Sequence, residues 1–184
     1  MTRIWPGPFY VAPFLALGAR RRVMFPDTGT DIPFRIENYA YIDSFGRETL
    51  TWARAFQFEW ERRFDETLIY SERRGRAVVY AGDHQHLAVD LDLSVGAGGS
   101  FVLKTGAQRL YEWPIAIRFP GFFSGTAHVE ESYDDGENRF KVTVAIANRF
   151  FGPIFGYEGW FRLEWREAGE IPAYARPVRE ERRE

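Results

Sequence analysis

From residue 32 onward, apolar and polar residues alternate along the chain with a period of two, and turn residues separate the alternating runs. Because successive side chains of a β-strand point to opposite faces, this period predicts strands rather than helices. Nine strands are predicted, over residues 32–43, 48–58, 63–73, 76–81, 85–95, 100–110, 126–133, 140–148 and 154–165. Short connections join them, so we expect an all-β fold, a single antiparallel meander of about nine strands. Such a sheet tends to curl until its edges meet, which predicts an up-and-down, lipocalin-like β-barrel.

Two segments flank the predicted barrel domain of residues 31–165. The lead, residues 1–30, contains the apolar run 9–19 followed by three arginines, and this run is shorter than the roughly 20 residues that span a bilayer. We expect a short irregular or helical lead that packs on the domain; the alternative is a shallow peripheral membrane or partner contact held by apolar residues and arginines. Residues 166–184 are charged and contain two prolines, which predicts a solvated tail with one docked turn at residues 171–174.

Two charged residues fall on strand faces that are otherwise apolar. Arg54 shares its face with Trp52 and Phe56, and Glu66 shares the face of the next strand with apolar neighbours that include Tyr70. A three-residue turn between these strands would set Arg54 directly opposite Glu66. Because a buried charge is rarely tolerated without a partner, two interpretations stay open. Either the pair is an internal ion pair that fixes the register, or Arg54 holds the carboxylate or carbonyl of a ligand at the bottom of an apolar cavity.

Glu131 is a third inward-facing charge in the alternation of residues 126–133. It would form one cluster with Arg54 and Glu66, and paired carboxylates can perform acid–base chemistry when burial separates their pKa values. In the last strand Tyr157 also faces inward, next to Gly159, which indicates a barrel corner or room for a ligand. The candidate ligand-binding residues are therefore Trp52, Arg54, Phe56, Glu66, Tyr70, Glu131 and Tyr157. The pattern assigns no catalytic residue and no metal ligand.

The stretch DHQHLAVDLDL, residues 83–93, places two histidines and two aspartates on alternate positions of one strand. Since its apolar residues point inward, His84, His86, Asp90 and Asp92 point to the outside of the sheet. A His-x-His pair can hold a metal, but a catalytic zinc site normally needs a third protein ligand from elsewhere. We therefore expect a solvent-exposed strand face here and not a metal site.

Charge and composition exclude several classes of function. The chain has 24 basic and 26 acidic residues, a net charge of −2, so it lacks the basic surplus typical of nucleic-acid-binding proteins. The absence of cysteine excludes disulfides and thiolate metal sites, and it fits a cytoplasmic protein. Neither a nucleotide-binding glycine loop nor a serine nucleophile motif is present, and we predict no cofactor.

Two stretches of the sequence resemble a known family. They are TWARAF, residues 51–56, and RFKVTVAIANRFFGPIFGYEGWF, residues 139–161. The first fits a Trp-x-Arg-x-Phe pattern, and the second fits alternating apolar residues, then a glycine, then Tyr-x-Gly-x-Phe. The late positions are Phe140, Val142, Val144, Gly152, Tyr157, Gly159 and Phe161. Over residues 25–165 the chain resembles the bacterial domain-of-unknown-function family 4166.

This resemblance implies no defined activity. Domains of that family are often fused behind NAD-dependent epimerase-like or saccharopine-dehydrogenase-like domains, which implies an accessory role beside an oxidoreductase-type protein partner. At residues 83–86 the sequence departs from the family pattern, with DHQH where many members carry a Gly-Pro or similar turn, so no family role passes to these histidines.

Three functions stay open at this point. The leading hypothesis is a non-catalytic β-barrel that binds a small apolar or amphipathic ligand, because barrels of about eight strands can enclose one such molecule. The second is an interaction module for an NAD-dependent dehydrogenase or epimerase-type partner. The third is an isomerase or hydrolase that uses Arg54 with Glu66 or Glu131. An interior filled completely by side chains would argue against the first.

Overall fold

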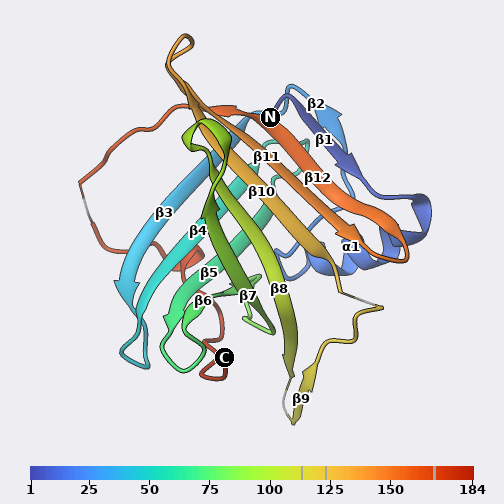
Figure 1. Cartoon of the computed structure of the whole chain (residues 1–184), viewed down its shortest axis with the longest axis vertical. Helices are drawn as coiled ribbons and strands as arrows, with labels where there is room; N and C mark the ends of the chain where they lie inside the picture. Colours follow the sequence, from blue (N-terminus) through green and yellow to red (C-terminus); the bar gives the residue numbers. More distant parts are fainter. Residues whose placement is uncertain (113, 123, 168) are drawn as a thin grey trace.

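The computed structural model describes residues 1–112, 114–122, 124–167 and 169–184 (Figure 1). Its elements are β1 (Arg3–Pro6), the 3-10 turn η1 (Phe9–Val11), α1 (Ala12–Ala19), β2 (Gly29–Thr30), β3 (Phe34–Ile42), β4 (Glu48–Phe56), β5 (Arg62–Ser71), β6 (Arg76–Ala81), β7 (Leu87–Val95), η2 (Ala97–Gly99), β8 (Phe101–Glu112), β9 (Ile115–Arg118), β10 (Thr126–Asp134), β11 (Arg139–Asn148), β12 (Gly152–Phe161) and η3 (Ala173–Ala175). Of the described helices, none is long and apolar enough to cross a bilayer.

The described strands form one 12-stranded antiparallel sheet. Its order is β2-β1-β12-β11-β10-β8-β7-β6-β5-β4-β3, and β9 pairs with β8 beside this path. All nine predicted strands are present, as β3 to β8 and β10 to β12, and the all-β antiparallel prediction is confirmed. The strands that the pattern missed are β1, β2 and β9, which have four, two and four residues. Segments this short cannot display a period of two.

The predicted closure into a barrel is not confirmed. The sheet is strongly curved (Figure 1), but its edge strands β2 and β3 do not pair with each other in the described ladder. They follow one another in the chain, and Pro33 between them has no backbone N–H to donate. The connection between them is instead held to the N-terminus, where the Ile32 N–H donates to the Met1 carbonyl at 2.9 Å.

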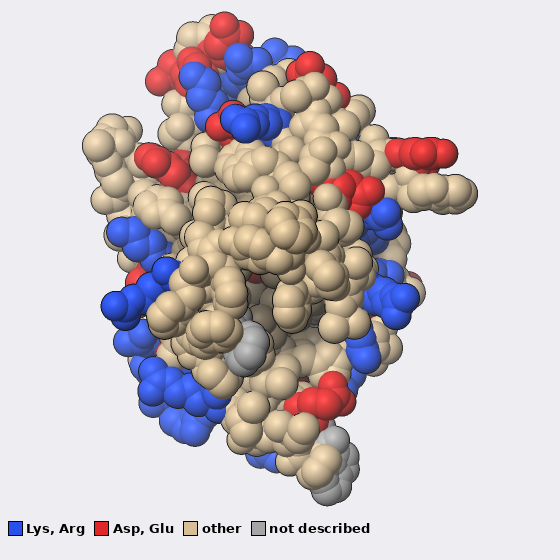
Figure 2. Space-filling view, turned by 90° about the vertical axis from the view of Figure 1, so that its right-hand side faces the viewer, with Lys and Arg blue, Asp and Glu red and all other residues tan. Residues whose placement is uncertain are grey.

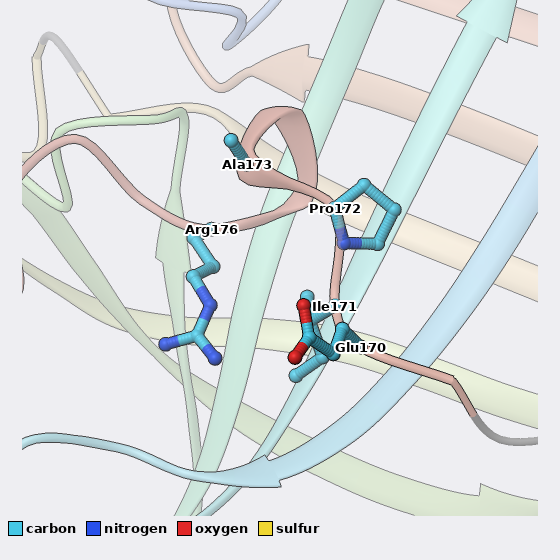
Figure 3. A pocket seen from close by; sticks show the side chains of 5 residues that line it. All are labelled: Glu170, Ile171, Pro172, Ala173 and Arg176. Carbon is cyan, nitrogen blue, oxygen red and sulfur yellow. The ribbon is translucent and has the colours of Figure 1, made fainter.

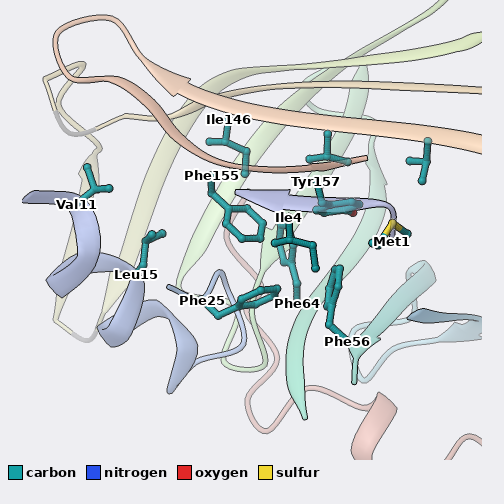
Figure 4. Packing of buried hydrophobic residues seen from close by; sticks show 12 residues of the cluster. Met1, Ile4, Val11, Leu15, Phe25, Phe56, Phe64, Ile146, Phe155 and Tyr157 are labelled. Carbon is teal, nitrogen blue, oxygen red and sulfur yellow. The ribbon is translucent and has the colours of Figure 1, made fainter. Parts of the chain in front are cut away.

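One end of the sheet's concave side is filled by a core to which the N-terminal lead contributes. Val11 and Leu15 are buried there with Phe25, which follows α1. Figure 4 shows Phe25 between the side chains of α1 and those of Phe56 in β4 and Tyr157 in β12, which belong to the same buried cluster. Ring centroids lie 4.9 Å apart for Phe25–Phe56 and 5.2 Å apart for Phe56–Tyr157. The short helical lead is therefore present as α1, and it closes this end of the interior.

Strand β1 lies against β12 because two glycines leave room for it. A Cβ atom on Gly156 would come within 2.5 Å of the Trp5 ring, and one on Gly159 would come within 2.7 Å of the Met1 sulfur. Any side chain at either position would collide with the N-terminal segment. The space beside Gly159 is thus occupied by the N-terminus and is not left for a ligand.

The C-terminal tail crosses the convex side of the sheet, which corrects the prediction of a solvated tail. Ala175 in η3 is buried, close to the predicted docked turn. Further along, the Glu181 N–H donates to Oε1 of Gln85 at 2.6 Å. The hydroxyls of Tyr80 and Tyr111 each donate to a tail carbonyl at 2.9 Å. Polar side chains on the convex side hydrogen-bond to the backbone of the tail. The tail therefore packs on the sheet although it is charged and contains prolines.

Candidate functional site

Arg54 and Glu66 form an ion pair on the concave face, the side of the sheet that carries Phe56 and Tyr157. Nη1 of Arg54 donates to Oε2 of Glu66 at 2.7 Å, and the two side chains are only 11% and 17% exposed. The Arg54 guanidinium also lies over the Trp52 ring, 5.3 Å from its centroid. Arginine is suited to this place because its flat cation stacks on rings while its N–H groups bind a carboxylate.

The predicted register of this pair is wrong, although the pair itself is present. Trp52 and not Arg54 lies opposite Glu66, and Arg54 lies opposite Phe64. The connection spans residues 57–61 and is longer than the three-residue turn assumed. A shift of two residues keeps every side chain on its face, so the ion pair forms along the diagonal between neighbouring strands.

Glu131 and Tyr157 complete the cluster from the facing strands β10 and β12. Burial raises the pKa of Glu131, and the attraction of Arg54 opposes this only in part. Burial likewise raises the pKa of the Tyr157 phenol to about 12, so it is neutral at physiological pH. Since Glu66 already compensates Arg54, an ionised Glu131 gives the cluster one net negative charge. The predicted cluster of three inward charges is present.

All seven predicted site residues lie on the concave face, but at different depths. Trp52 stacks on Arg54 and packs against the neighbouring apolar cluster of β6 to β8. Phe56 is fully buried in the core, where its ring contacts Tyr157. Tyr70, by contrast, lies four residues beyond Glu66 along β5 and is exposed. The structure therefore brings together the polar residues and Trp52, leaves Phe56 in the core and places Tyr70 at the rim.

Beyond the cluster, the concave face is apolar and uncovered. Six large hydrophobic side chains on it are 42% to 80% exposed and are named here the open face: Ile42, Tyr70, Leu93, Val95, Phe101 and Tyr133. The open face adjoins the cluster, because Phe101 pairs directly with Glu131 and Tyr133 follows on the same side of β10. Alternation in the sequence shows that these side chains face inward, but it cannot show whether other side chains fill the interior at their level.

His84 and His86 lie on the convex side, as predicted, but not in solvent. Their rings stack with centroids 5.4 Å apart, and Nδ1 of His86 lies 2.7 Å from a carboxylate oxygen of Glu112. Burial lowers the pKa of His86. The predicted solvent-exposed face is wrong for His86, which the tail covers through Arg179, whereas Asp92 of the same stretch is exposed as predicted.

Asp90, from the same stretch, is 3% exposed and accepts hydrogen bonds from Arg74 and Arg109 at 2.6 to 2.9 Å. The two arginines satisfy the Asp90 carboxylate, so it needs no metal ion. Among the described residues, no group of three or more histidine, aspartate or glutamate side chains is arranged to hold a metal ion.

Residues of the tail line a separate, open depression of about 630 Å³ (Figure 3). Its walls come from one short segment, with Glu170, Pro172 and Arg176 among the lining residues. None of the predicted site residues lines it. A second pocket, of about 410 Å³, lies between β8 and the loop after β9, lined by residues that include Gln108 and Arg118.

Comparison with known proteins gives two matches. The family described as Domain of unknown function (DUF4166) matches the chain over residues 1–161. The uncharacterized protein YndH of Bacillus subtilis (strain 168) is 32% identical over 169 residues, which are 91% of this chain and 82% of that protein. No solved structure matches. The family match begins at residue 1. It therefore includes β1 and α1, which the sequence pattern had assigned to a separate N-terminal lead.

Proposed function

The chain belongs to the family described as Domain of unknown function (DUF4166), and because that description states no activity, we propose a function from the geometry: the concave face binds a small amphipathic molecule. The apolar part of the ligand lies on the open face, and its polar end reaches the cluster of Arg54, Glu66 and Glu131.

The observation that carries this proposal is the adjacency of the two surfaces. Glu131 is the direct strand partner of Phe101, so the polar cluster ends where the exposed apolar side chains begin. Covering one large apolar side chain contributes about 1.5–3 kcal/mol. A ligand that covers several side chains of the open face would thus gain enough to offset its loss of freedom on binding. Sites for small molecules typically combine apolar walls with a few polar groups in this way.

The charges of the cluster indicate a neutral polar end. Glu66 already neutralises Arg54, and Glu131 adds negative charge whenever it is ionised. A carboxylate on the ligand would be buried beside this surplus without a free cation, which is costly. A hydroxyl or carbonyl group can instead exchange hydrogen bonds with the carboxylates and the guanidinium. We therefore expect a long-chain alcohol or ester to bind more tightly than the matching acid.

A direct test is a fluorescence titration with two dansyl-labelled undecyl chains, one ending in an alcohol and one in a carboxylate. The proposal predicts saturable binding of both at pH 7, with the alcohol favoured. Val95→Gln should weaken both by about tenfold or more, because it removes an apolar contact worth more than about 1.4 kcal/mol. Glu131→Gln should tighten the carboxylate probe selectively, because it removes the opposing charge.

Val178→Gln is the matched control. Val178 lies in the tail and is 70% exposed, against 80% for Val95, so both substitutions remove a similar exposed side chain. The proposal would be refuted if Val95→Gln and Val178→Gln bound the probes equally tightly, or if the wild-type protein showed no saturable probe binding.

A further inference from the structure

A second exposed apolar surface lies at the other end of the molecule, on the N-terminal helix. Helix α1 contains no polar side chain. Leu15 faces the core and is fully buried, whereas Phe14 and Leu17 on its outer side are 66% and 62% exposed. A helix at the surface of a globular protein normally has polar residues on its outer side. The outer side of α1 is therefore built to contact something apolar.

Neighbouring turns extend this surface. The Phe122 ring, in the loop before β10, lies 5.3 Å from that of Phe150 in the turn between β11 and β12. Phe122 also contacts Phe151, whose ring lies 6.1 Å from that of Tyr10 beside α1. The resulting patch, named here the apolar tip, consists of Phe9, Tyr10, Phe14, Leu17, Phe122 and Phe150. Figure 2 looks onto the side of the molecule that carries α1. Its centre is an uncharged, hollowed surface, with basic side chains on both flanks and acidic side chains above and below it.

The three chain segments that build the apolar tip carry positive charge only. Residues 1–26, 113–129 and 138–157 contain no aspartate or glutamate, in a chain that has 26 acidic residues. Arginines adjoin each part of the tip: Arg20 follows α1, Arg118 precedes the loop before β10, and Arg149 precedes Phe150. All three are exposed, and none of them forms a salt bridge with a described residue.

We propose that the apolar tip docks on the surface of a bilayer that contains anionic lipids. Aromatic and leucine side chains at the tip would enter the boundary between headgroups and acyl chains, while the arginines would contact lipid phosphates. A second copy of the chain fits this surface less well, because two tips placed face to face would bring their arginines together. Docking at the tip does not depend on ligand binding at the open face, so either proposal can fail without the other.

The test is co-sedimentation of the full chain with vesicles of phosphatidylcholine, with and without phosphatidylglycerol. The proposal predicts binding that needs phosphatidylglycerol and weakens as salt is raised, since screening reduces the attraction of exposed charges. The double variant Phe14→Ser/Leu17→Ser should reduce binding at least about tenfold. The triple variant Arg20→Gln/Arg118→Gln/Arg149→Gln should reduce binding to vesicles with phosphatidylglycerol to the level seen without this lipid. All five residues are exposed, so both variants are expected to fold.

Two controls match these changes elsewhere on the surface. Trp165→Ser/Val178→Ser removes two exposed hydrophobic side chains of the tail, and Arg162→Gln/Arg166→Gln/Arg182→Gln removes the same charge from other exposed arginines. Both should bind vesicles as the wild type does. The proposal is overturned if the tip variants match these controls, if phosphatidylglycerol has no effect, or if sedimentation shows a dimer that Phe14→Ser/Leu17→Ser dissociates. Val95→Gln should weaken probe binding but leave vesicle binding unchanged, which separates this proposal from that for the open face.

Discussion

Arg54 holds a charge on the concave face because its partners come from several strands. Glu66 binds it from β5, Trp52 stacks on it from β4, and Glu131 acts on it from β10. Breaking a buried pair by removing one partner leaves the other charge uncompensated. The ion pair therefore contributes to the fold whether or not a ligand also uses it, and the structural role assigned to it from the sequence is compatible with a binding role.

Glu66→Gln should lower the free energy of unfolding by about 2 kcal/mol at pH 7, because the Arg54 guanidinium loses its hydrogen-bonded carboxylate and Glu131 compensates its charge only in part. Urea denaturation measures this change. Glu164→Gln is the control, since it breaks the Arg166–Glu164 pair at 3.2 Å, in which both side chains are more than 70% exposed. No measurable change is expected there. Equal effects of the two substitutions would show that the Arg54 pair is not buried as described.

At the level of elements, the sequence could predict the strands whose faces differ in polarity. The nine long strands have this contrast, and each was found from its alternation. The tail has none: Glu181 and its neighbours dock through hydrogen bonds to side chains far away in sequence, such as Gln85. Gly156 is needed because Trp5 of β1 packs against it, and no local sequence pattern reveals this contact between distant segments. The same limit applies to the site, where the inward charges were predicted but the length of the turn that sets their register was not.

Docking of the tail should depend on pH through Glu181. Burial alone would raise the pKa of this carboxyl, but hydrogen bonds from Arg183 and Arg179 outweigh burial and bring the pKa to about 2. The folded state thus prefers the ionised form, and this stabilisation is present above pH 4.5 and lost as the pH falls toward 2. Glu181→Gln should cost up to about 3 kcal/mol at pH 7, and its difference from the wild type should close below pH 4.5.

Hydrogen exchange of the tail amides, measured together with urea denaturation, would follow this effect. The control is Glu170→Gln, because Glu170 is an exposed acidic residue of the same tail. A difference between Glu181→Gln and the wild type that stays constant from pH 7 to pH 2 would contradict the assigned role.

At the scale of the whole molecule, the interior divides into a filled end and an open end. α1 and the aromatic core around Phe56 fill the first, and the open face forms the second, with the cluster around Arg54 between them. The apolar tip lies outside the filled end. Sequence alternation predicted the inward residues of both ends, but only the exposure of side chains such as Val95 shows that one end is uncovered. The proposed binding of an amphipathic molecule rests on that difference.

Native mass spectrometry of the protein, incubated with a long-chain alcohol, tests this central claim most directly. Binding at the open face predicts a complex with one alcohol molecule per chain, seen with wild-type protein and with Val178→Gln but strongly reduced with Val95→Gln. A spectrum that shows only unbound protein, or uptake that is the same in all three proteins, would contradict the account.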